Sequence, residues 1–151
     1  MKIREEIAEE FNRHRGLLDN SVLTETVRER FCKIADGKAE YDEYSGSLKF
    51  LSKCLYEASG EKVIILLDEY DVPLENAYFK GFYEQMADFM RSLFESSLKT
   101  NDYLQMAVIT GCLRVSKESI FTRLNHLNII SVLDKKYSEH FGFTEAEVMQ
   151  S

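Results

Sequence analysis

The sequence lacks a hydrophobic run that could cross a membrane, since no apolar stretch approaches the roughly 18 residues of a transmembrane helix. Residues 1–7 form an acidic amphipathic stretch, which does not fit a signal peptide. Cysteine is also scarce: Cys32, Cys54 and Cys112 are odd in number and widely spaced, so they fit neither a disulfide framework nor a zinc site. We therefore expect a cytoplasmic protein with reduced thiols and no membrane partner.

Positive charge is in short supply as well. The chain has 19 lysines and arginines against 26 acids, which gives a formal net charge of -7. This balance argues against a broad nucleic-acid-binding surface, because such surfaces need clustered basic residues. The 151 residues have the size of one ordinary domain, and a hydrophobic content of 44% is enough to bury a core.

Apolar residues recur at helical spacing in several parts of the chain. The pattern predicts helices over residues 2–14, 21–36, 47–59, 81–99 and 116–124. Irregular structure is expected between them, at residues 36–44 and 74–80, where the chain is polar or follows Pro73. A capping box at residues 144–147 indicates the start of another helix close to the end of the sequence.

The rest of the chain is organised around the stretch Val63–Asp71, which reads Val-Ile-Ile-Leu-Leu-Asp-Glu-Tyr-Asp. Five consecutive apolar residues predict a strand that is buried on both faces of a parallel sheet. Asp68 and Glu69 then follow at its carboxyl end, the edge at which open α/β sheets bind ligands. An apolar strand that ends in Asp-Glu is the Walker B pattern of P-loop ATPases. The first acid would hold Mg²⁺ through water and the second would polarise the attacking water. The alternative is a buried strand that runs into an acidic turn without any catalytic role.

A second strand is predicted at residues 106–109, after the long helix, and a weaker third one at residues 127–133. A strand, a helix and a strand form a right-handed parallel crossover in most proteins, so the first two strands should lie side by side. Thr110 and Gly111 would then share a sheet edge with Asp68, and Arg114 would follow within a few residues. A cation at this edge suits a sensor of the γ-phosphate, although a surface arginine paired with an acid would look the same.

Three segments together resemble the bacterial AAA-ATPase-like family. They are Val63–Tyr78, the Asp88–Phe94 part of the long helix, and Val108–Phe121, which reads Val-Ile-Thr-Gly-Cys-Leu-Arg-Val-Ser-Lys-Glu-Ser-Ile-Phe. The closing Phe141–Val148 is similar as well. Members of this family often carry a C-terminal nuclease-like domain of the PD-(D/E)XK type, so nucleic acid would be a partner only through such a fused domain.

The resemblance implies a fold and a division of the chain. The fold class would be α/β, a partial P-loop NTPase of the AAA/ASCE type, with three layers and parallel strands, preceded by a helical region. Residues 1–151 would form a single incomplete domain. Its parts would be a helical region at 1–58, a strand and helix core with the Walker B and sensor strands at 59–133, and the start of a helical segment at 134–151.

The resemblance also assigns roles to the residues at the sheet edge. Asp68 would be the Mg²⁺-associated acid and Glu69 the catalytic acid, while Thr110 and Arg114 would bind nucleotide at the sensor position. The implied cofactors of the complete domain are Mg²⁺ and ATP. The sequence departs from the family pattern around Asn125, where Arg123 and His126 stand in place of a glycine and a second asparagine, which leaves the role of Asn125 open. The roles of Tyr70, Asp71 and Asn76 are open too.

The sequence lacks the phosphate-binding motif G-x-x-x-x-G-K-[ST]. Gly37-Lys38 is followed by Ala39, and Gly60 is followed by Glu61, so neither glycine belongs to such a loop. Three interpretations follow. The chain is part of an ATPase and inactive alone, or it is a protein-interaction module derived from an ATPase that self-associates through exposed strand edges. The third and weakest is a metal-dependent nuclease or phosphatase built on Asp68, Glu69 and Asp71.

Overall fold

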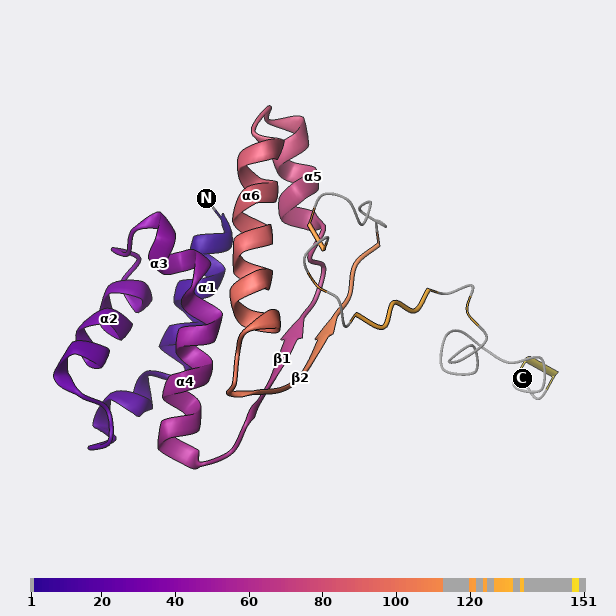
Figure 1. Ribbon diagram of the computed structural model, residues 1–151. Helices are drawn as coiled ribbons and strands as arrows, with labels where there is room; N and C mark the ends of the chain where they lie inside the picture. Colours follow the sequence, from indigo (N-terminus) through magenta and orange to yellow (C-terminus); the bar gives the residue numbers. More distant parts are fainter. Residues whose placement is uncertain are drawn as a thin grey trace.

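A computed structural model describes residues 2–112, 120–121, 124, 127–131, 134 and 148–149 of the chain. In Figure 1 a group of helices lies beside a two-stranded sheet, and a pair of antiparallel helices rises at the end of the strands. The elements are α1 (Lys2–Arg13), the 3₁₀ helix η1 (Arg15–Asp19), α2 (Glu25–Ala35), α3 (Tyr41–Ser45), α4 (Ser47–Ser59), β1 (Val63–Leu67), α5 (Val72–Phe79), α6 (Tyr83–Phe94), the π-helical turn η2 (Glu95–Lys99) and β2 (Leu104–Ile109). The fold is thus a helix-rich α/β arrangement. No helix in the described part of the chain is long and apolar enough to cross a membrane.

The amino-terminal helices pack through aromatic rings. Phe11 of α1 lies 4.9 Å from the ring of Phe31 in α2 and 6.2 Å from the ring of Phe50 in α4, and the side chains of Phe11 and Phe31 are fully buried. The helices predicted at residues 2–14 and 47–59 are confirmed. The second helix is also present, but it begins at Glu25 rather than near residue 21.

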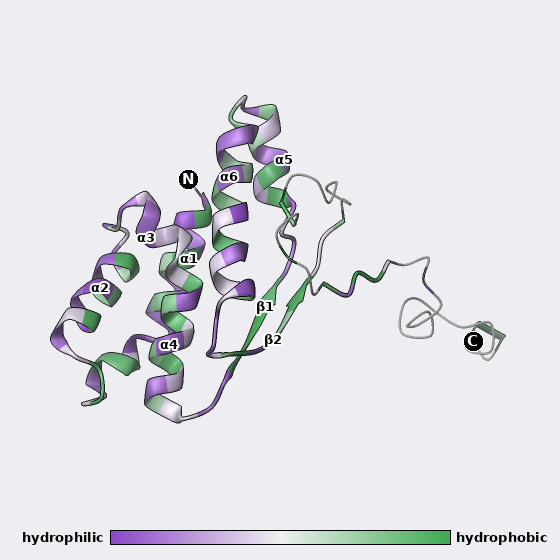
Figure 2. Ribbon diagram, in the orientation of Figure 1, coloured by the Kyte–Doolittle hydropathy of each residue, from purple (hydrophilic) through white to green (hydrophobic). Residues whose placement is uncertain are grey.

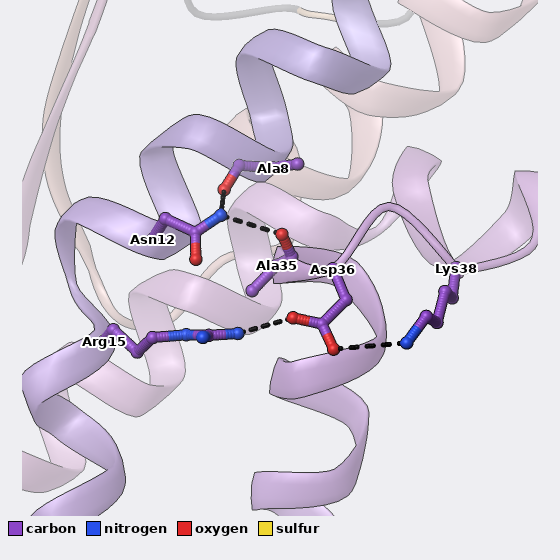
Figure 3. Close-up of polar contacts among 6 residues, drawn as sticks. All are labelled: Ala8, Asn12, Arg15, Ala35, Asp36 and Lys38. Carbon is purple, nitrogen blue, oxygen red and sulfur yellow. Dashed lines mark hydrogen bonds and ion pairs between the residues drawn. The ribbon is translucent and has the colours of Figure 1, made fainter.

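Polar contacts fix the carboxyl ends of α1 and α2 against each other (Figure 3). The side-chain amide of Asn12 donates to the carbonyl of Ala35 over 2.8 Å and to the carbonyl of Ala8 over 2.9 Å. Asp36 pairs with Arg15 at 2.5 Å and with Lys38 at 3.6 Å. The carbonyl of Ala35, the last residue of α2, is therefore satisfied from a neighbouring helix.

Two segments that the sequence predicted to be irregular contain helices. Within residues 36–44, α3 begins at Tyr41 because Glu40 and Glu43 form a reciprocal capping box, with the Glu40 N–H donating to the Glu43 carboxylate. The prediction for residues 74–80 is wrong, because these residues belong mostly to α5. Pro73 lies in the first turn of α5, where a missing N–H costs nothing, so it starts this helix after the strand.

The strands β1 and β2 are parallel neighbours, as predicted, and α5, α6 and η2 connect them. Ile64 lies opposite Met106 and Leu67 opposite Ile109, with one irregularity in the register near Val63. The ladder runs past the strand ends: the Thr110 N–H donates to the Leu67 carbonyl at 2.8 Å, and the Tyr70 N–H donates to the Thr110 carbonyl at 3.0 Å. The crossover thus brings the residues after both strands to one edge.

One face of this sheet is apolar and exposed. Ile64 and Leu66 are 52% and 72% exposed, and Met106 and Val108 of β2, which lie opposite them, are 51% and 43% exposed. Figure 2 shows both strands in the colour of hydrophobic residues. The expectation that β1 is buried on both faces is therefore wrong for the described residues. Helices contact the sheet on its other face, and no described element covers this one.

The predicted third strand at residues 127–133 is not formed by its described part. Residues 127–131 have no strand or helix, and Leu127, Ile129 and Ile130 are 38–42% exposed. The Ser131 N–H instead donates to the Asp134 carboxylate over 2.6 Å, which closes a turn. Most of the helix predicted at residues 116–124 and the capping box at residues 144–147 lie outside the described residues.

Candidate functional site at the carboxyl ends of β1 and β2

The candidate site begins with the carboxylate of Asp68, the first residue after β1. The Thr110 hydroxyl donates to Asp68 Oδ1, and the Glu69 N–H donates to the same oxygen over 3.1 Å. Because both donors go to Oδ1, Oδ2 has no hydrogen-bond donor among the described residues, and the side chains of Asp68 and Thr110 are exposed. The sheet edge therefore presents an oriented carboxylate with one oxygen left for an external ligand.

Glu69 has a left-handed backbone, with a φ of 52°. For a residue other than glycine this conformation costs about 1–2 kcal/mol. It turns the chain sharply at the end of β1, and the Val72 N–H donates to the Glu69 carbonyl over 3.1 Å to complete the turn. Two adjacent acids thus lie exposed at the sheet edge, although neighbours in a regular strand would point to opposite faces.

The turn is anchored by Tyr70 and Asp71, whose roles the sequence left open. The Tyr70 ring contacts the rings of Phe94 and Phe121 edge-on, with centroid distances of 6.3 and 5.2 Å. Asp71 is only 4% exposed, and its carbonyl accepts the Leu74 N–H at the start of α5. Both residues are therefore parts of the packed floor beneath the exposed acids. Asn76 donates to the Val72 carbonyl within α5.

Gly111 lies directly against this floor. A Cβ atom at Gly111 would come within 2.5 Å of Tyr70 Cε1 and within 2.8 Å of the Asp71 Oδ1 atom. Only glycine permits this close approach between the turn after β1 and the turn after β2. Sequence reasoning placed Gly111 at the correct edge but missed this role, and its only sequence signal is a glycine directly after a strand.

The oxygen atoms at this edge suit a hard cation. Mg²⁺ is usually held by one or two carboxylates together with waters and phosphate oxygens. The free Oδ2 of Asp68 matches such a ligand. No group of three or more candidate metal-binding side chains exists within the described residues, so a multi-carboxylate centre is not present in that part of the chain. The residues fit Mg²⁺ as a partial site that phosphate oxygens would complete.

The structure therefore brings together three of the four predicted site residues, namely Asp68, Glu69 and Thr110. Arg114, predicted as the sensor cation, lies outside the described residues, and so does Asn125. The prediction for Arg114 therefore stays a prediction.

Comparison with known proteins gives the affiliation of the chain. The model of a family described as "Predicted AAA-ATPase" matches residues 2–121. The chain belongs to the AAA-ATPase-like family. The match includes β1, β2 and the whole edge with Asp68, Glu69 and Thr110, and it confirms the resemblance seen in the sequence.

One relative is a protein of Azotobacter chroococcum mcd 1 described as "Uncharacterized protein in vnfD 5'region". It is 32% identical over 118 residues, which make up 78% of this chain and 21% of the relative. The chain thus spans about a fifth of the length of this relative. No solved structure matches the chain.

Proposed function

We propose that these residues carry the metal-binding and water-activating half of an ATP-hydrolysing site. The observation that carries the proposal is the hydrogen bond from Thr110 to Asp68, which joins the residues after two adjacent parallel strands. Ligands of open α/β sheets bind at this edge. Membership of the AAA-ATPase-like family supports the choice of ATP as the substrate.

Each residue has a distinct role in this proposal. Asp68 would hold Mg²⁺ through a water molecule, and Thr110 keeps the carboxylate in one orientation by donating to Oδ1. Bound Mg²⁺ neutralises charge on the phosphate oxygens. Glu69 orients and polarises the attacking water, since it is exposed beside Asp68 at the left-handed turn that follows β1. Arg114 contributes positive charge to the γ-phosphate.

The groups that bind the phosphates of ATP would come from a different part of the protein. The 151 residues contain no G-x-x-x-x-G-K-[ST] motif, whose backbone N–H groups and lysine hold the phosphates in P-loop ATPases. We therefore expect residues 1–151 alone to show no Mg²⁺-dependent ATP turnover. In this proposal they act as part of a P-loop NTPase fold that a phosphate-binding loop completes.

The test compares the 151-residue chain with a longer polypeptide that includes the reading frame upstream of Met1. The short chain should release phosphate from ATP no faster than its own Glu69→Gln variant. If the upstream sequence encodes the phosphate-binding motif, the longer polypeptide should hydrolyse ATP. Its Glu69→Gln variant should lose at least about a hundredfold of that rate, the usual loss when a positioned catalytic group is removed. Glu75→Gln, an exposed acid on α5, is the matched control.

Three results would overturn the proposal in different ways. One such result is that the short chain hydrolyses ATP and loses this activity in its Glu69→Gln variant. That result would disprove the proposal that residues 1–151 carry only half of the ATP-hydrolysing site. Equal turnover by the longer wild type and its Glu69→Gln and Asp68→Asn variants would remove these acids from the mechanism. An upstream sequence without a phosphate-binding loop would leave the chain without a means of holding ATP.

The second candidate function is a protein-interaction module, and one observation favours it. The exposed apolar face formed by Ile64, Leu66, Met106 and Val108 is continuous across both strands. Parallel sheets are normally covered on both faces, and no described element covers this one, so further polypeptide would pack on it. This function does not require Asp68 or Glu69. It would therefore remain possible if the ATPase proposal were disproved.

A further inference from the structure

A small aromatic pocket of about 330 Å³ lies at the tip of the hairpin that α5 and α6 form. Its lining comes from the last turn of α5, from the connection and from the first turn of α6, and consists of Tyr78, Gly81, Phe82, Tyr83, Glu84 and Gln85. In Figure 1 this connection is the end of the hairpin that lies away from β1 and β2. The pocket is therefore separate from the acids at the sheet edge.

Two tyrosine rings meet at a right angle in this pocket. The ring centroids of Tyr78 and Tyr83 are 6.3 Å apart, and the ring planes are inclined by 86°. Phe82 supplies a third aromatic side chain to the lining and packs against the hydrophobic core. A corner of aromatic rings with different orientations is typical of the cages that bind cations.

The backbone of the connection holds these rings in place. The Gly81 N–H donates to the Tyr78 carbonyl over 3.2 Å, and the Phe82 N–H donates to the Ala77 carbonyl over 3.0 Å. Gly81 has a left-handed φ of 77°, which lets the chain reverse directly after α5. Ala77 is fully buried, so the connection is fixed to the packed part of the hairpin. The pocket is thus formed before a ligand binds, which lowers the entropic cost of binding.

The charges of the pocket favour a cation. The faces of aromatic rings are negative, and the carboxylate of Glu84 belongs to the lining. Among the described residues, none donates to this carboxylate or forms an ion pair with it. Lys80 lies in the connection but does not line the pocket. An anion attracted by the amino-terminal end of α6 would meet both Glu84 and the ring faces, so the pocket does not suit an anion.

The pocket is too open to enclose a free small molecule. Tyr78 is 70% exposed, whereas ligand sites usually bury about 70–90% of the surface of their ligand. The neighbouring Phe79 is 78% exposed, and its ring lies 5.8 Å from the ring of Tyr78 without belonging to the lining. Exposed aromatic side chains around a charged anchor are typical of protein interfaces. A cation that is attached to a polypeptide fits both features, because its chain can cover Phe79 while its side chain fills the pocket.

We propose that this pocket binds an arginine side chain of a partner polypeptide. A planar guanidinium group stacks on aromatic faces and donates two parallel hydrogen bonds to a carboxylate. Tyr78 and Tyr83 hold the plane of the guanidinium, and Glu84 accepts from its N–H groups. The ammonium group of a lysine has no plane to stack. Apolar residues beside the arginine contact Phe79. The proposal is independent of ATP hydrolysis, because it uses none of the residues at the sheet edge.

The probe for this proposal is the acetylated and amidated peptide Gly-Leu-Arg-Leu-Gly, titrated with the 151-residue chain and followed by NMR. The side-chain protons next to the guanidinium should move upfield on binding, because they come to lie over the faces of aromatic rings. The same peptide with citrulline has the shape of the arginine peptide without its charge, and it should bind at least about tenfold more weakly. Methylguanidinium is the head group without a polypeptide, and it should also bind at least about tenfold more weakly.

Two substitutions at exposed positions of the chain test the pocket itself. Tyr78→Leu removes a ring face and Glu84→Gln removes the charge, and each should weaken binding of the arginine peptide at least about fivefold. Glu84→Gln should also narrow the difference between the arginine and citrulline peptides. The matched controls are Tyr56→Leu on α4 and Glu75→Gln on α5, which replace exposed residues outside the lining and should bind the peptide as the wild type does.

Four results would overturn the proposal. No binding of the arginine peptide at millimolar concentration would remove it outright. Equal binding of the arginine and citrulline peptides would show that charge plays no part. Methylguanidinium that binds as tightly as the arginine peptide would show that a free small cation is the ligand and not a polypeptide. Unchanged binding in both Tyr78→Leu and Glu84→Gln would place the peptide elsewhere on the chain.

Discussion

Gly111 and Tyr70 are in such close contact that a single methyl group does not fit between them. A Cβ atom on Gly111 would lie 2.5 Å from Tyr70 Cε1 and 2.7 Å from Cδ1. The Tyr70 ring cannot easily move away, because Phe94 and Phe121 contact it edge-on. The turn after β2 therefore packs directly against the turn after β1 that carries Asp68 and Glu69.

Gly111→Ala should destabilise the protein by about 1–3 kcal/mol, the usual cost of forcing an extra methyl group into packed structure. Chemical denaturation followed by circular dichroism measures this change. Gly16→Ala is the control, because nothing lies within 4 Å of a Cβ there, and it should change the free energy of unfolding by less than about 0.5 kcal/mol. Equal stability of wild type and Gly111→Ala would show that the contact is not tight in solution.

The parts of the fold that could be predicted from the sequence depend on local patterns. The sequence predicts a parallel crossover from the apolar run of β1, the apolar face of α6 and the strand before Thr110. This crossover placed Asp68 and Thr110 at the same sheet edge before any contact was known. The hydrogen bond between these two residues follows from topology. The family match covers Asp68, Glu69 and Thr110 but assigns no role to them.

The remaining features depend on interactions that a pattern does not carry. Pro73 was interpreted as a breaker, yet it starts α5, because the first turn of a helix needs no N–H from it. The run of apolar residues in β1 indicated burial on both faces, whereas Ile64 and Leu66 are exposed. The apolar run shows that β1 is suited to burial on both faces. The described residues cover only one of these faces.

Asn12 joins the ends of two helices and offers a second test of the packing. Asn12→Ala should lower the free energy of unfolding by about 0.5–1.5 kcal/mol, because the Ala35 carbonyl at the end of α2 loses its donor. Urea denaturation measures the change. Arg13→Ala is the matched control on the same helix. Its guanidinium makes only an exposed pair with Glu10, so its effect should be within about 0.5 kcal/mol. A larger loss in Arg13→Ala than in Asn12→Ala would contradict this account.

Cys54 gives the protein a predictable response to alkaline pH. Its side chain is fully buried. Burial, with a smaller contribution from the Glu57 carboxylate, raises the pKa of its thiol from 9.0 to about 11. The folded protein therefore holds this proton more tightly than the unfolded chain. The contribution to stability is fully present below pH 9 and is lost as the pH rises to about 11.

Urea denaturation at several pH values between 8 and 11 tests this expectation. Because tyrosines and lysines also titrate in this range, the informative quantity is the difference between wild type and Cys54→Ala. This difference should shrink as the pH rises. Cys112→Ala, at an exposed position, should follow the wild type at every pH. Cys112 should also react rapidly with a thiol reagent in the folded protein, while Cys54 reacts only on unfolding. A constant difference across the pH range would refute the role of Cys54.

Self-association should follow from the sheet itself. The outer edge of β2 has no partner among the described residues, and Val108 adds exposed apolar surface beside it. Such edges pair with other copies unless a charge protects them. We expect sedimentation velocity to show oligomers that grow with concentration, and we expect Val108→Lys to shift the chain toward monomer. Val22→Lys, a change of the same kind at a 57% exposed residue far from the sheet, should leave the oligomers in place. A wild-type chain that stays monomeric at high concentration would mean that these edges are protected in solution.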